Sequence, residues 1–198
     1  MASSLTHGIG AALSIFAVIL MVVRAEGALE ITSVAIFGAT LIILYTSSTI
    51  YHLVARDPLK QFFQLLDHSS IYLLIAGSYT PLTFLVLGGP WGWSLFGVVW
   101  GLAIAGIIFK AATHGQNDHW ISTAVYILMG WLVIIALKPL LEVMETAGFV
   151  LLAAGGLFYT LGVIFFVREK MPFNHAIWHL FVMGGSACHV IAVLNYML

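Results

Sequence analysis

Seven long runs of apolar residues, separated by short polar or turn-forming stretches, dominate the pattern along this chain. A helix that crosses a membrane needs about 20 mostly apolar residues, and each run is close to that length or exceeds it. The breaks between runs contain charges, glycines and prolines, as in Arg56-Asp57-Pro58 and Gly88-Gly89-Pro90. The pattern therefore predicts seven transmembrane helices, at residues 7–23, 31–54, 64–87, 91–110, 120–138, 147–167 and 174–197.

The composition agrees with a membrane location. Hydrophobic residues make up 62% of the chain and charged residues only 8%, whereas a soluble domain carries roughly 25% charged residues. We therefore predict an all-α integral membrane protein in which residues 1–198 form a single seven-transmembrane-helix bundle. The basic residues are dispersed and form no patch that would bind nucleic acid. The single cysteine, Cys188, excludes an intrachain disulfide.

The first run could also be interpreted as a signal peptide. Residues 1–6, however, contain no Lys or Arg, and no Ala-x-Ala-like cleavage site follows, so we expect a retained helix. With seven spans, the loops at 55–63, 111–119 and 168–173 share one side, which carries five basic residues when Lys110 at the end of the fourth run is included, against Arg24 and Lys138 on the other side. The positive-inside rule then predicts a cytoplasmic amino terminus.

Three short polar patterns interrupt the apolar runs: Ser48-x3-His52, Asp67-His68 and His175-x3-His179. Ionisable side chains are costly inside a membrane, so such residues are functional-site candidates by default. By the predicted topology, His52 lies in the last turn of the second helix, Asp67 in the first turn of the third, and His175 near the start of the seventh. The three patterns should therefore meet at one depth on the cytoplasmic side.

These residue types in this arrangement predict a zinc site. Residues four apart share a helix face, so His175 and His179 can reach one ion together with His52. Three protein ligands with an open fourth position are typical of catalytic zinc, which lowers the pKa of a bound water towards 7. Asp67 could hold or deprotonate that water, and Ser48 could orient a substrate carbonyl. Imidazole ligands favour zinc over metals that prefer oxygen. The alternative is that the histidines are solvent-exposed side chains at the membrane interface and bind no metal.

At these residues the chain resembles the hemolysin III family of bacterial membrane proteins, within the progestin and adiponectin receptor superfamily. The matching stretches are Thr6-His-Gly-Ile-Gly10, Ser48-Thr-Ile-Tyr-His52, Leu66 to Pro81, and His175-Ala-Ile-Trp-His179 with His189 beyond it. The resemblance implies seven helices, a cytoplasmic amino terminus, a location in the bacterial inner membrane, and Zn2+ bound by His52, His175 and His179. Asp67 would contact the zinc through water, and Ser48 is the superfamily's motif serine. His68 occupies a variable position and is not expected to be a ligand.

The superfamily resembles alkaline ceramidases in this site, which implies metal-dependent hydrolysis of a lipid amide or ester, with a membrane lipid as substrate or ligand. Two non-enzymatic alternatives stay open. One is a receptor-like or regulatory membrane protein with structural zinc, and the other is a pore-forming cytolysin.

The remaining histidines suggest weaker hypotheses. His189 is expected to form an interhelical hydrogen bond, although it could line a cavity. His7 is expected to be interfacial, although it could cover the metal site. His114 and His119 share a polar loop with Asp118 and are expected to be solvated.

The stretch Ser78-Tyr79-Thr80-Pro81 interrupts the third apolar run halfway along its length. A proline there frees a backbone carbonyl that neighbouring groups must satisfy. The resulting kink could open a lipid-sized cavity above the zinc, or it could serve packing alone.

Overall fold

Backbone polar groups find no water in a hydrocarbon core, so the apolar runs satisfy them within helices. The computed structural model of the protein describes residues 2–113, 119–168 and 170–198, and these ranges contain no strand. The elements are α1 (Ala2–Arg24), α2 (Ala28–Leu53), α3 (Leu59–Pro81), the π-helical η1 (Leu82–Leu87), α4 (Gly89–Ala112), α5 (His119–Gly130), the 3-10 helix η2 (Leu132–Ala136), α6 (Leu137–Val143), α7 (Thr146–Phe166) and α8 (Asn174–Tyr196).

Seven stretches of the described chain are long and apolar enough to cross a membrane. In two of them the span contains more than one helix, because η1 continues α3, and α5, η2 and α6 together form one crossing. The predicted seven-helix transmembrane fold is therefore confirmed.

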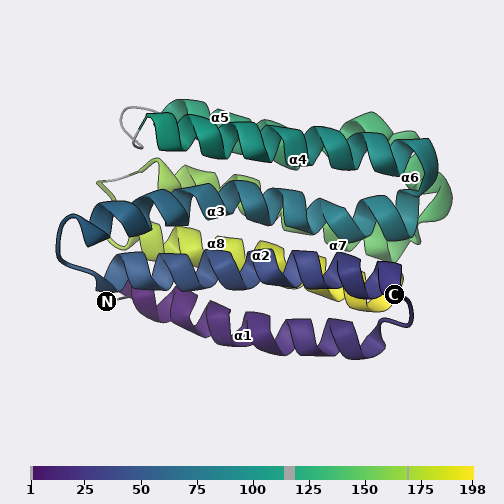
Figure 1. The fold of residues 1–198 in the computed structure, drawn as a ribbon, viewed down its shortest axis with the longest axis horizontal. Helices are drawn as coiled ribbons and strands as arrows, with labels where there is room; N and C mark the ends of the chain where they lie inside the picture. The colour runs from purple at the N-terminus through teal and green to yellow at the C-terminus, as the bar shows by residue number, and fades with distance from the viewer. Residues whose placement is uncertain (1, 114–118, 169) are drawn as a thin grey trace.

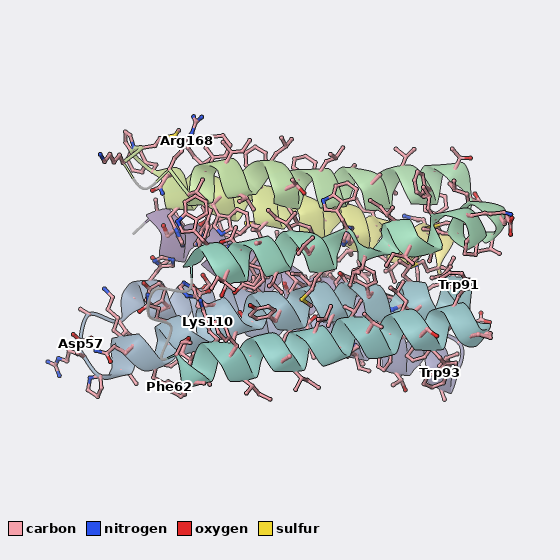
Figure 2. The ribbon with its side chains drawn as sticks, turned by 90° about the horizontal axis from the view of Figure 1, so that it is seen from above. Asp57, Phe62, Trp91, Trp93, Lys110 and Arg168 are labelled. Atoms are coloured by element: carbon pink, nitrogen blue, oxygen red, sulfur yellow. The ribbon has the colours of Figure 1, made fainter. Side chains whose placement is uncertain are left out.

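The helices lie side by side, with α2 between α1 and α3, and α7 along α8 (Figure 1). The start of α1, the turn between α2 and α3, and the start of α8 all lie at one end of the bundle, which we call the amino-terminal end. Figure 2 shows Asp57, Lys110 and Arg168 towards this end and Trp91 and Trp93 at the opposite end. Charged groups and tryptophans thus gather where a bundle in a bilayer meets the two interfaces.

The largest differences from the predicted helix starts are in α1 and α3. The helix α3 begins at Leu59 rather than at residue 64, which places Asp67 in its third turn and not in the first. The helix α1 begins at Ala2 rather than at residue 7. A run of apolar residues marks only the part of a helix that lies in the hydrocarbon core. The more polar residues before the run extend the same helix into the membrane interface, so the observed helix starts earlier than the run.

The fifth span also differs from its prediction. A helix over 120–138 was expected to end at Lys138 and Pro139, but the chain stays helical through η2 and α6 to Val143. Pro139 is the third residue of α6. The first backbone N–H groups of a helix have no intrahelical partner, so a proline is tolerated there.

Tyr79, from α3, satisfies the backbone at the break between α5 and η2. Its hydroxyl lies 3.0 and 2.9 Å from the carbonyl oxygens of Met129 and Gly130, to which it donates. The same oxygen accepts the N–H of Val133 at 3.0 Å. One phenol thereby replaces helical hydrogen bonds in the middle of the bundle, and this irregular backbone borders the cavity described below.

Candidate metal centre

Three histidines from two helices converge at the amino-terminal end of the bundle. His52 lies in the last turn of α2, and His175 and His179 lie in the first two turns of α8. Each offers one ring nitrogen, and the three nitrogen atoms lie within 4.8 Å of one another. The ring centroids are 4.6 to 5.1 Å apart. The spacing and depth of these residues in the sequence therefore predicted their proximity correctly.

The first two turns of α1 fix the orientation of His179, which is fully buried. The Nδ1 atom of His179 lies 3.0 Å from the hydroxyl of Thr6 and 3.1 Å from the carbonyl oxygen of Ser3. The Thr6 hydroxyl donates its own hydrogen to the same Ser3 carbonyl, at 2.9 Å. This network assigns the ring hydrogen of His179 to Nδ1. The opposite nitrogen, Nε2, then carries the lone pair that a metal ligand requires.

His52 has a ring nitrogen that is ready to bind a ligand. Its Nε2 atom is buried and has no hydrogen-bond partner among the described residues. A buried polar atom without a partner is costly, and coordination to a metal would remove that cost. Three neutral imidazoles form a donor set that suits zinc better than magnesium or calcium. The residues present therefore fit a zinc ion.

Asp67 and Ser48 face each other beside this cluster. Asp67, on α3, is 7% exposed, and Ser48, on α2, is 1% exposed. The Ser48 hydroxyl lies next to the Asp67 carboxyl, but it forms no hydrogen bond of standard geometry with the described residues. Both side chains line the same cavity as His175 and His179. The structure thus brings together the five residues singled out in the sequence, and their chemical roles stay predictions.

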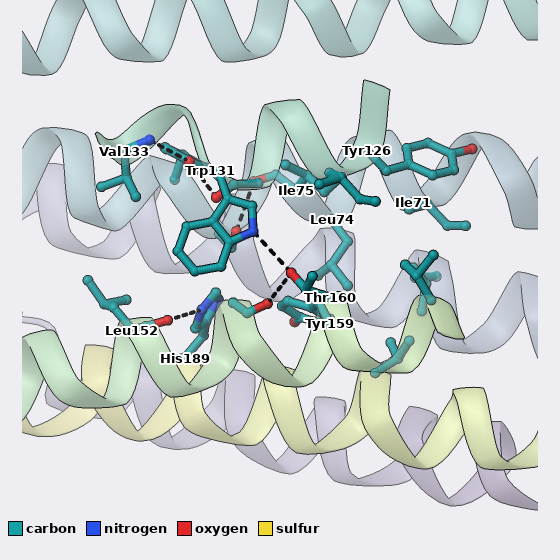
Figure 3. A pocket seen from close by; sticks show the side chains of 18 of the residues that line it. Ile71, Leu74, Ile75, Tyr126, Trp131, Val133, Leu152, Tyr159, Thr160 and His189 are labelled. Atoms are coloured by element: carbon teal, nitrogen blue, oxygen red, sulfur yellow. Dashed lines mark hydrogen bonds between the residues drawn. The ribbon is translucent and has the colours of Figure 1, made fainter. Parts of the chain in front are cut away.

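A cavity of about 390 Å³ extends from this cluster into the bundle. Along α3 and the first residue of η1 it is lined from Asp67 to Leu82, a length of about 22 Å at 1.5 Å per residue. Figure 3 shows its inner part, where the Trp131 indole donates to the Thr160 hydroxyl at 3.0 Å. Most of its walls are apolar side chains, and Asp67, His175 and His179 lie at one end of it. This combination is typical of a small-molecule pocket.

His7 lies against the histidine cluster, as in the alternative prediction that it covers the site, and not exposed at the interface. It was expected at the interface, but its side chain is 3% exposed and stacks on the ring of His179, with centroids 3.4 Å apart. Thr6, which holds His179, was not recognised. The sequence does place the Thr6-His7 pair at the same depth as the other polar patterns. That depth indicates a contact with His179 only when the packing of α1 against α8 is known.

The other histidines are placed as follows. His189 makes the expected interhelical hydrogen bond, from Nε2 to the carbonyl oxygen of Leu152 at 3.3 Å, and it also lines the cavity (Figure 3). His68 is buried and lines the cavity, and it is not part of the group of three. His114, Asp118 and the side chain of His119 lie outside the described residues.

Comparisons with known proteins agree with these features. A family model described as haemolysin-III related matches residues 1–190. Hemolysin-3 of Bacillus cereus is 48% identical over 200 aligned residues, covering 100% of this chain and 91% of the relative. A hemolysin-3 homolog of Bacillus subtilis is 45% identical and covers 98% and 92% of the two chains. The human monocyte to macrophage differentiation factor is 32% identical over 171 residues, which cover 82% of this chain and 69% of that protein.

Proposed function

The chain belongs to the haemolysin III family, as its motifs indicated, and from this premise we propose that it is a zinc-dependent hydrolase of a membrane lipid amide or ester. One observation carries the proposal: three imidazoles converge, and two of them, His175 and His179, line an elongated, mostly apolar cavity together with the buried carboxylate of Asp67. Membership of a fold does not by itself support a particular reaction. The proposed hydrolysis is supported by the site, which combines possible metal ligands with space for an acyl chain.

His52, His175 and His179 would hold the zinc. A bound zinc ion supplies a water-derived nucleophile at neutral pH and polarises a carbonyl oxygen. The Asp67 carboxylate would accept the proton of the attacking water, and the Ser48 hydroxyl would orient the water or the carbonyl beside it. The apolar walls between α3, α7 and α8 would hold the acyl chain and exclude bulk water from the site.

The proposed location is the cytoplasmic leaflet of the cell membrane, the bacterial inner membrane. Five basic residues in the loops and helix ends at the amino-terminal end, against two at the opposite end, support a cytoplasmic amino terminus. The Bacillus origin of two relatives supports a bacterial setting. A substrate would then reach the site from the inner leaflet.

Metal analysis combined with a hydrolysis assay tests the proposal. We expect the purified protein to contain about one zinc per chain by mass spectrometry of the metal, because the site has one group of three ligands. It should release fatty acid from long-chain N-acyl amides or esters in nanodiscs. Removal of zinc by a chelator should abolish release, and zinc addition should restore it. The proposed hydrolase activity would be contradicted if zinc-loaded protein hydrolysed none of these lipids.

Thr6→Val is expected to weaken zinc binding without removing a ligand. Loss of the hydroxyl frees the His179 ring to rotate or change tautomer, and such outer hydrogen bonds typically contribute 10- to 100-fold to metal affinity. Competition with a zinc chelator measures the change. Thr49→Val is the matched control, because the Thr49 hydroxyl bonds only to the carbonyl of Tyr45 in its own helix. Equal zinc affinity in both variants would contradict the role of Thr6.

The names of the two Bacillus relatives favour a second candidate function, membrane lysis. A cytolysin should release dye from liposomes when the purified protein is added from outside. We expect no release, because the protein has seven apolar spans that must already be in a membrane. Dye release that depends on protein concentration would favour lysis over hydrolysis.

A further inference from the structure

His7 is a buried side chain whose two polar atoms are unused. Neither Nδ1 nor Nε2 has a hydrogen-bond partner among the described residues. The ring is held on two sides, stacked on His179 and edge-to-face with Tyr45 at a centroid distance of 4.9 Å. A neutral imidazole has one N–H donor and one acceptor, and burying both without partners is costly. A structural role in packing would not require this residue type.

The stacking geometry excludes His7 as a ligand of the ion that His179 would bind. An imidazole coordinates a metal in the plane of its ring. The His7 and His179 rings are 3.4 Å apart and inclined by only 10°, so their planes do not meet near either ring. In agreement with this, His7 is not a member of the group of three histidines. Its nitrogens must serve something other than that ion.

His7 lines the cavity beside Ser48, Asp67 and His179. Its position is fixed because α1 packs closely on α2 at Gly10, where a Cβ atom would lie 2.7 Å from the Tyr45 ring. Because no described residue bonds to its nitrogens, a molecule inside the cavity is the partner that this position offers. Since the same wall holds the proposed metal ligands, that molecule would place its reacting group here.

We propose that His7 contacts the substrate, forming a hydrogen bond to the amide or ester group of the lipid and holding that group beside His179. This inference rests on the proposed function. It adds a substrate contact from α1, the helix that also orients His179 through Thr6, and it assigns His7 to recognition of the polar group and not to the metal or to the acyl chain.

Two ligands of similar chain length test the inference in zinc-loaded protein in nanodiscs. Oleamide carries an amide group and octadecene carries none. His7→Phe keeps a flat ring in the stack but removes both polar atoms, and we expect it to bind oleamide about 10-fold more weakly than the wild type, the loss of one hydrogen bond. Its affinity for octadecene and its zinc content should not change. His7→Gln, which retains a donor and an acceptor, should recover part of the affinity for oleamide.

Several outcomes would overturn the inference. Wild-type affinity of His7→Phe for oleamide would show that no such hydrogen bond exists, and loss of zinc from this variant would assign His7 to the metal centre. If His7→Phe does not fold, ¹⁵N resonances of the His7 ring in the wild type should shift with oleamide and not with octadecene, and no shift would reject the proposal. Failure of the proposed function is distinct, because the zinc-loaded wild type would then release no fatty acid from lipid amides or esters, whatever the effect of His7→Phe on oleamide binding.

Discussion

His52→Ala protein is expected to contain less than about a tenth of the wild-type zinc and to have no measurable hydrolase activity. The variant removes one of the three proposed ligands, the one contributed by α2. Two imidazoles on one helix remain, and they cannot enclose an ion. Because loss of a residue that only orients a ligand already costs 10- to 100-fold in affinity, loss of a ligand should exceed that range. Metal analysis and fatty-acid release measure the two effects.

Two further variants exclude a general disturbance of the fold. In His189→Asn protein the change lies on α8, ten residues beyond His179 and about 15 Å along the helix, so zinc content should stay at the wild-type level. In His52→Cys protein a thiolate can replace the imidazole, so part of the zinc should return. Full zinc content and activity in His52→Ala protein would refute the metal centre.

Asp67→Asn is expected to lower the turnover rate by about 10² to 10⁴-fold, the usual contribution of a general base. The amide keeps the shape of the carboxylate but cannot accept the proton of the attacking water. Zinc content and the melting temperature in detergent should stay near wild-type values, because Asp67 is not in the group of three histidines. Asp57→Asn is the matched control, since Asp57 is exposed in the turn before α3 and its variant should keep full turnover.

The same variant separates the hydrolase from a receptor-like or regulatory protein with structural zinc. In the regulatory case, Asp67→Asn protein should keep its cellular activity, and removal of zinc should lower the melting temperature instead. Unchanged turnover in Asp67→Asn protein with full zinc content would therefore contradict the proposed chemistry while leaving the metal centre in place.

Much of the candidate site was predictable because its signals are local. Hydrophobic run length is a property of continuous sequence, so the seven spans could be counted. The spacing of His175 and His179 fixes their shared helix face, and the short turn at Pro58 makes α2 and α3 neighbours. The helix starts were less accurate, because polar residues in an interfacial turn leave no hydrophobic signal. The early starts of α1 and α3 are both of this kind.

The sequence by itself determined the class of protein, the number of membrane crossings and the three histidines that meet. Only the tertiary structure decided what surrounds them. The hydrogen bond between Thr6 and His179 joins residues 173 positions apart, and no local pattern specifies which helix packs there. Likewise, Tyr79 hydrogen-bonds to the backbone at the break between α5 and η2, although the hydropathy of that span predicts one continuous helix. Burial of His7 follows from the same packing of α1 on α8, because a side chain's environment is set by its neighbours in space and not by those along the chain.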